Sequence, residues 1–248
     1  MKKALVFLLL CMMLAGLCLP VSAGESDRRL TLVNPWNVIP EDWTVELVSV
    51  GNGHRVDKAC YEDLMAMMVA CREAGYAPEV KSSYRSRATQ NRLHENKVSQ
   101  WKGYGYSEEE AREKAATIVA VPDTSEHQLG WAVDIVDKSY PFLNEKQAQT
   151  PAQQWLMAHS WEYGFILRYP VDRSDVTGII YEPWHYRWVG RENAKKIHGS
   201  GLCLEEYLAY AAKKEILRDA VTHGWEETAR RILRILVGKT LPASVIKP

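Results

Sequence analysis

The chain has 248 residues, which is enough for one sizeable hydrophobic core or for one domain with an appendage. Its 31 basic and 31 acidic residues balance. It therefore lacks the basic excess with which nucleic-acid-binding proteins neutralise phosphates, and we expect no nucleic-acid partner. The composition is otherwise that of an ordinary soluble globular protein.

Residues 1–23 predict a secretion signal. Two lysines are followed by an apolar run at residues 4–19 and by Val-Ser-Ala at 21–23, a small-residue cleavage site. The apolar run is short for a membrane span, although an uncleaved anchor, or a lipoprotein attached through Cys18, remains an alternative. We expect a secreted or cell-envelope protein that touches a membrane only through this segment or through its C-terminal helix.

Three cysteines follow the signal, namely Cys60, Cys71 and Cys203. An odd number cannot form a complete set of intrachain disulfides. Cys60 and Cys71 share one face of a predicted helix with Leu64 and Met67, which favours buried thiols. They would lie about 16 Å apart along that helix, too far to bridge. We therefore place no cysteine in the functional site.

The first half of the chain predicts strands, one apolar helix and two polar helices. In order these are a strand at 45–50, a helix at 58–74, a strand at 78–83, and helices at 88–98 and 107–119. Asp57 is suited to cap the first helix and Gly75 to end it. The last helix opens with a capping box from Ser107 to Glu110. Residues 101–106 predict a loop rich in glycine and aromatic residues.

The second half predicts short strands and then helices up to the C-terminal region. In order these are a strand at 131–136, a helix at 152–163, strands at 165–168, 179–181 and 184–189, and helices at 191–198, 203–217 and 219–236. The last helix has arginines beside an apolar side. It would dock on the domain or, alternatively, touch an anionic surface, and docking is the preferred interpretation.

Asp134 lies inside the apolar run at residues 131–136. Strand periodicity puts it on one face with Ala132 and Val136. An aspartate buried there is unfavourable unless it is ionised and paired, or bound to a metal. The alternative is an edge strand on which Asp134 meets water or an arginine.

Two histidines and a second acid complete a set of possible metal ligands. His127 precedes Asp134 by seven positions, and a Glu-Pro-Trp-His segment supplies Glu182 and His185. Two imidazoles, one carboxylate and one spare carboxylate fit a catalytic zinc site with an open position for water and a base beside it. On an unbroken strand Glu182 and His185 would face opposite sides, but Pro183 allows a bend that turns both toward one point.

Three ordered motifs carry a family resemblance. They are Ser-Ser-Tyr-Arg-Ser at 82–86 with Gln90, Ser-Glu-His-Gln-Leu-Gly-Trp-Ala-Val-Asp at 125–134, and Glu-Pro-Trp-His-Tyr-Arg at 182–187. Together they resemble the VanY-type D-alanyl-D-alanine carboxypeptidases, zinc peptidases that act on bacterial cell-wall peptides. The segment Leu-Val-Asn-Pro-Trp-Asn at 32–37 is also similar to the start of these domains, and the resemblance covers residues 30–210.

The resemblance implies a role for each motif. His127, Asp134 and His185 would hold Zn2+, Glu182 would be the general base, and Arg85 would bind substrate or stabilise the tetrahedral intermediate. Residues near the substrate would be Gln90, Ser125 and Trp184. Arg187 could line the cleft or serve as an ion-pair partner.

The resemblance also implies an α+β fold, in which a mainly antiparallel sheet holds the zinc and is flanked by helices. We expect a signal peptide at 1–23, a carboxypeptidase domain at 24–213 and a helical C-terminal extension at 214–248. The implied reaction removes the terminal D-Ala from peptidoglycan stem peptides through a metal-activated water.

Several alternatives remain at this point. An L,D-carboxypeptidase would trim tetrapeptide stems, and a D,D-dipeptidase would cut free D-Ala-D-Ala. A non-catalytic cell-wall-binding module with a structural metal would need neither Glu182 nor Arg85. Iron oxygenases use a similar set of two histidines and one carboxylate, and metal analysis would distinguish them from a zinc enzyme.

Overall fold

The computed structural model describes residues 27–224 and Thr228. Arg28–Glu205 forms one compact unit, which holds the sheet and the candidate site. The rest of helix α8 (Leu204–His223) belongs to a second unit. The predicted signal peptide and most of the predicted C-terminal helix lie outside the described residues, so these two predictions and the domain boundaries stay predictions.

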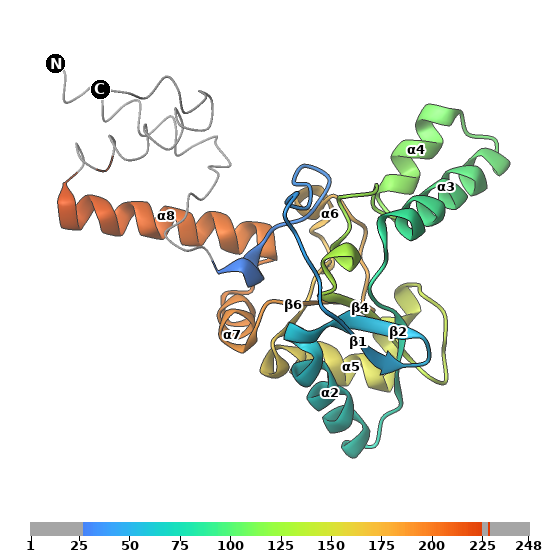
Figure 1. Cartoon of the computed structure of the whole chain (residues 1–248), viewed down its shortest axis with the longest axis horizontal. Coiled ribbons are helices and arrows are strands. Elements are labelled where there is room, and N and C mark those ends of the chain that lie inside the picture. Colours follow the sequence, from blue (N-terminus) through green and yellow to red (C-terminus); the bar gives the residue numbers. More distant parts are fainter. Residues whose placement is uncertain (1–26, 225–227, 229–248) are drawn as a thin grey trace. The chain divides into compact units, whose positions relative to one another are not determined.

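A four-stranded antiparallel sheet lies at the centre of the domain (Figure 1). In spatial order its strands are β3 (Pro78–Ser82), β4 (Ala132–Asp137), β6 (His185–Trp188) and β5 (Phe165–Leu167). Strand β4 is paired on both sides, so the alternative of an edge strand is wrong, although Asp134 does meet an arginine, Arg85. Opposite residues of an antiparallel pair point to the same face, and Asp134 lies opposite His185.

The other face of the sheet is covered by the hydrophobic core. Val133 and Ile135 of β4 and Tyr186 of β6 pack there with residues of helices α2 (Lys58–Glu73) and α5 (Pro151–His159). The contributions of the two helices include Leu64, Met67 and Leu156. The alternation along β4 and β6 therefore sends apolar side chains inward and leaves the opposite face for the polar site.

Helix α2 follows the predicted pattern closely. It begins after a hairpin of β1 (Leu47–Gly51) and β2 (His54–Asp57). The Asp57 carboxylate caps it by accepting a hydrogen bond from the amide of Ala59. Its two cysteines are buried, as is Cys203, which confirms the expectation of buried thiols.

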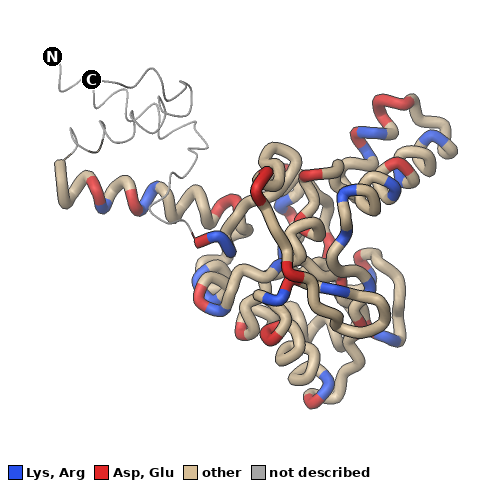
Figure 2. Tube along the Cα trace, viewed as in Figure 1, with Lys and Arg blue, Asp and Glu red and all other residues tan. Residues whose placement is uncertain are grey.

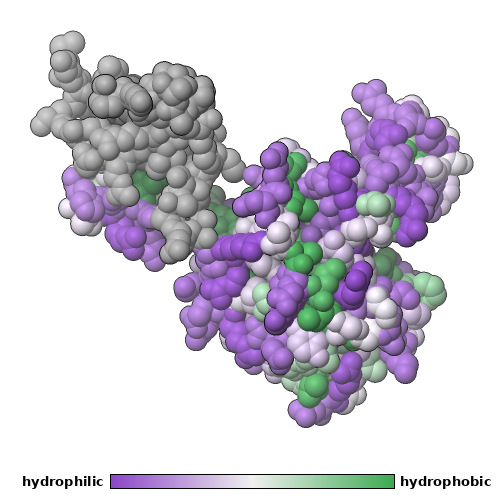
Figure 3. Space-filling model, viewed as in Figure 1, coloured by the Kyte–Doolittle hydropathy of each residue, from purple (hydrophilic) through white to green (hydrophobic). Residues whose placement is uncertain are grey.

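Helices α3 (Arg87–Gly103) and α4 (Glu108–Ala116) lie side by side (Figure 1). Their surface is mainly hydrophilic and carries both signs of charge, with Arg112 paired to Glu95 (Figures 2 and 3). The predicted capping box at Ser107 is present. The predicted loop at 101–106 is partly wrong, because Trp101 packs against the small core of this helix pair and α3 continues to Gly103.

Several shorter elements complete the domain. They are the 3-10 helices Arg28–Leu30, Glu126–Leu129 (η2), Glu145–Gln149 and Ser160–Tyr163, and the helices α6 (Ser174–Thr177) and α7 (Arg191–Ser200). The predicted strand at 179–181 is wrong, because these residues are irregular ahead of the Pro183 turn. The predicted break between helices at 217–219 is also wrong, since α8 runs through it. Within residues 27–224, no helix combines the length and the apolar character that crossing a membrane requires.

Candidate active site

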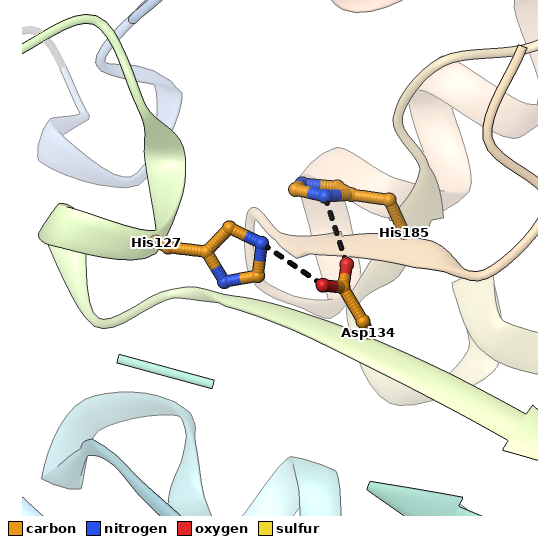
Figure 4. A group of neighbouring side chains, drawn as sticks. All are labelled: His127, Asp134 and His185. Carbon is orange, nitrogen blue, oxygen red and sulfur yellow. Dashed lines mark ion pairs between the residues drawn. The ribbon is translucent and has the colours of Figure 1, made fainter. Parts of the chain in front are cut away.

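Three side chains that are far apart in the sequence meet on the polar face of the sheet. His127 comes from η2, Asp134 from β4 and His185 from β6 (Figure 4). One possible ligand atom from each lies within 4.8 Å of the other two. The Asp134 carboxylate stands between the imidazoles, with Oδ2 3.4 Å from His127 Nε2 and Oδ1 3.2 Å from His185 Nδ1. All three residues are buried.

Gly130 turns the chain from η2 into β4. Its φ of 76° lies in the left-handed region, where a glycine meets no steric penalty. A Cβ at this position would also lie 3.0 Å from the Cβ of Asp57. The glycine therefore allows the tight turn that places His127 beside Asp134.

The ring of His127 is oriented by the backbone. Its Nδ1 lies 2.8 Å from the carbonyl oxygen of Ser83. A carbonyl can only accept, so Nδ1 carries the proton and donates it, and the unprotonated Nε2 faces Asp134. The amide of Arg85 donates in turn to the carbonyl of His127 at 3.2 Å, which ties the end of β3 to η2.

The donor set fits a zinc ion. The Oδ1 atom of Asp134 is buried and makes no well-aligned hydrogen bond among the described residues, although His185 Nδ1 lies 3.2 Å away. Leaving such an acceptor unpaired is costly, and a bound cation would remove that cost. Two imidazole nitrogens and one carboxylate oxygen are the three protein ligands typical of catalytic zinc.

The pKa values of the site residues follow from burial and from neighbouring charges. Burial lowers the pKa of His127 to about 4, and the positive charge of Arg85 acts in the same direction. Burial also disfavours the charged form of His185, but the carboxylates of Asp134 and Glu126 outweigh it and raise its pKa to about 9. Burial would raise the pKa of Asp134, yet both histidines and Arg85 hold it well below its usual value.

Glu182 reaches the site through the turn at Pro183. The amide of His185 donates to the carbonyl of Glu182 at 3.1 Å, which closes the turn. The Oε2 atom of Glu182 then lies 3.6 Å from His185 Nδ1, so the predicted bend is confirmed. Burial raises the pKa of Glu182 to about 8, with Asp134 adding to the effect. A carboxylate with such a pKa is suited to proton transfer near neutral pH.

Arg85 is held on three sides. Its Nη2 donates to Asp134 Oδ2 at 2.8 Å, its Nε to the Ser82 hydroxyl at 2.9 Å and its Nη1 to the Gln90 amide oxygen at 3.4 Å. Gln90 is fully buried, and its amide nitrogen donates to the Ala120 carbonyl. The structure therefore gives Gln90 a clear part in positioning Arg85, whose side chain remains 16% exposed.

Ser125 and Trp184 flank the metal-binding motifs. Ser125 directly precedes η2 and is buried, and its hydroxyl does not cap that helix. Trp184 is also buried, and its carbonyl accepts from the amide of Ile135. Contacts of Gln90, Ser125 and Trp184 with a substrate stay predictions.

The sequence analysis missed a buried ion network behind the site. Glu126 Oε1 accepts from Arg168 Nε at 2.7 Å and from Arg187 Nη1 at 2.9 Å. Arg187 is thus an ion-pair partner rather than a cleft residue, which decides the alternative left open above. Sequence gives no signal for this role of Glu126, because an acid at the start of a short polar helix is normally exposed to solvent.

Comparison with known proteins decides the family. The family model of the VanY D-alanyl-D-alanine carboxypeptidases matches residues 53–191. A D-alanyl-D-alanine carboxypeptidase of Enterococcus faecalis is 45% identical over 185 residues, which cover 74% of this chain and 67% of that protein. The chain belongs to the VanY family. The VanY match includes all eight residues predicted for the site.

Solved structures of relatives share the fold. A VanY variant, described as a vancomycin-resistance D,D-pentapeptidase in complex with Zn(II), is 44% identical with a TM-score of 0.67, covering 73% of this chain and 98% of that one. The LD-carboxypeptidase LdcB is 34% identical with a TM-score of 0.62, covering 75% of this chain and 87% of that one. The α+β fold predicted from the resemblance is confirmed.

Proposed function

We propose that this VanY-family chain is a zinc-dependent D,D-carboxypeptidase that removes the terminal D-Ala from peptidoglycan stem peptides. The observation that carries the proposal is that the side chains of His127, Asp134 and His185 lie close together in a buried site, with Glu182 beside them. Two relatives support the choice of bond, since a D-alanyl-D-alanine carboxypeptidase and a D,D-pentapeptidase are 45% and 44% identical, whereas the LD-carboxypeptidase LdcB is 34% identical.

The three ligand residues would hold the metal through a neutral His127, a neutral His185 and an ionised Asp134. Zinc bound in this way acts as a Lewis acid that polarises a carbonyl and lowers the pKa of water. His127 is already neutral because of its lowered pKa, whereas His185 must release a proton when the metal binds.

Glu182 would act as the general base. Its carboxylate is buried next to His185, where it can take a proton from the attacking water. The protonated carboxyl can then deliver this proton to the nitrogen of the leaving D-Ala as the peptide bond breaks. One residue thus serves both proton transfers, and the carboxylate is restored at the end.

Arg85 would stabilise negative charge on the attacked carbonyl oxygen. Its guanidinium is fixed by Ser82, Gln90 and Asp134 before any substrate binds, so little reorganisation is needed during the reaction. A non-catalytic wall-binding module would require neither this prepositioned cation nor Glu182. Both residues therefore argue for an enzyme.

The test is hydrolysis by the purified, zinc-loaded chain. A pentapeptide stem ending in D-Ala-D-Ala should lose one alanine, identified by mass, and zinc should be present at one equivalent by metal analysis. Cleavage of a tetrapeptide stem alone would favour the L,D-carboxypeptidase instead, and cleavage of free D-Ala-D-Ala alone would favour a dipeptidase. Zinc binding without any cleavage would favour a binding module. His127→Ala should lose both zinc and activity.

We also propose that the protein works outside the cytoplasm, as residues 1–23 predict and as a peptidoglycan substrate requires. N-terminal sequencing of the protein recovered from an expressing bacterium tests this proposal. A mature chain that starts near residue 24 in the envelope or the medium is expected, and a full-length chain found only in the cytoplasm would contradict it.

A further inference from the structure

We propose that Glu126 is a positioning residue for the metal ligand His185. Its carboxylate accepts a hydrogen bond from Nε2–H of His185 and so keeps Nδ1, the nitrogen that faces Asp134, free of a proton and available to the metal. The inference rests on the proposed zinc site but concerns a residue outside the ligand set.

The proposal rests on two buried polar atoms that lie close together without forming a hydrogen bond. Glu126 Oε2 and His185 Nε2 are both buried and both lack a hydrogen-bond partner among the described residues. They lie 3.6 Å apart, just beyond hydrogen-bond range. A shift of about 0.5 Å would close a normal N–H···O bond, and it would satisfy two groups that are costly to leave unpaired.

The carboxylate of Glu126 cannot turn away from His185. Its side chain is fully buried, and its other oxygen accepts from both Arg168 and Arg187. Arg168 is held in turn by Glu205, and Arg187 by the backbone carbonyls of residues 29 and 31. Two fixed cations therefore point Oε2 at the imidazole.

The two histidines present different ring nitrogens to Asp134, and different acceptors orient them. His127 donates from Nδ1 to the Ser83 carbonyl and presents Nε2 to Asp134. His185 presents Nδ1 to Asp134, so Nε2 must carry the proton when the metal is bound. Glu126 is the acceptor that favours this tautomer.

The substitution Glu126→Gln should reverse the hydrogen bond. The amide oxygen is needed by the two guanidiniums, which can only donate, so the amide NH2 would face His185. A donor facing Nε2 stabilises the tautomer protonated on Nδ1, which cannot bind a metal through that atom. The change keeps the shape of the side chain and alters the preferred ligand nitrogen.

Glu205→Gln is the matched control. Glu205 also pairs with Arg168, so this variant removes one carboxylate charge from the same network. Among the described contacts it leaves the group facing His185 unchanged. An effect that comes only from weakening the buried ion network should appear in both variants.

The first measurement is zinc affinity by chelator competition at neutral pH, for the natural sequence and both variants. We expect Glu126→Gln to bind zinc about 10–100-fold more weakly. Glu205→Gln should stay close to the natural protein. Equal affinities for Glu126→Gln and the natural protein would overturn the proposal, as would equal losses in both variants.

The second measurement needs no variant at Glu126. Nitrogen-15 NMR of the zinc-loaded natural chain, labelled at histidine, should show His185 metal-bound at Nδ1 and protonated at Nε2, with its signals assigned by their loss in His185→Asn. Zinc bound through Nε2 of His185 would overturn the role of Glu126 while leaving the carboxypeptidase proposal intact. Failure of the natural chain to bind zinc would instead overturn the proposed function itself.

Discussion

Replacing Glu182 by glutamine should stop catalysis and, at the same time, stabilise the metal-free protein. Burial raises the pKa of this carboxyl from 4.5 to about 8. Between these two values the folded state holds a proton that the unfolded state has released, so stability falls as pH rises. At pH 7 the raised pKa lowers the free energy of unfolding by about 3 kcal/mol, from 1.36 kcal/mol per pKa unit. A neutral amide of the same shape does not incur this cost.

Two assays examine this prediction. Urea unfolding of EDTA-treated protein from about pH 5 to pH 8 should show that the stability gained by Glu182→Gln over the natural chain increases with pH. With zinc restored, hydrolysis of a pentapeptide stem should fall about 10²–10⁴-fold, the usual contribution of a general base, while the zinc content is unchanged.

Glu162→Gln is the control for the substitution itself. Glu162 is a partly exposed carboxylate that pairs with His159, outside the site. Its replacement should change neither the pH profile of stability nor the rate of hydrolysis. If Glu182→Gln shows the same pH profile as the natural chain, the burial argument is wrong. If it turns over substrate at a near-normal rate, Glu182 is not the base.

Three further predictions follow from the site. Arg85→Lys should keep zinc but lower the turnover number about 10²–10³-fold, because a single ammonium cannot replace the fixed guanidinium; an unchanged turnover number would contradict its role. Because the pKa of His185 is raised to about 9, zinc affinity measured by chelator competition should rise with pH up to about 9 and then level off; a pH-independent affinity would argue against a protonated His185. Gly130→Ala should destabilise the fold by about 1–3 kcal/mol in urea unfolding, given its φ of 76° and its closeness to Asp57; no loss would show that the turn tolerates a side chain.

Much of the architecture could be predicted because its signals are local. The Asp57 cap, the Ser107 capping box and the apolar period of α2 each depend on residues within a few positions of one another. The Pro183 turn is equally local, and it correctly placed Glu182 beside His185. The length of α3 was not predictable in this way, because its end depends on packing against α4.

The buried ion network of Glu126 could not be predicted, because its members are far apart in the sequence. Glu126 meets partners 42 and 61 positions away, Arg168 and Arg187. Sequence shows that each residue is charged, but burial of a charge is a property of the folded neighbourhood. The resemblance to a family identified the residues expected to bind the metal, and only the structure showed what holds them in place.

The pairing of β4 with β6 has a consequence for how the site forms. Asp134 and His185 are directly opposite each other, while their neighbours Val133 and Tyr186 enter the apolar interior. Sliding either strand by one position would exchange the two sets and bury an acid or an imidazole among hydrocarbons. The register that packs the interior correctly is therefore the same register that aligns these ligands. A chain with a shifted register would lose both the packed core and the site.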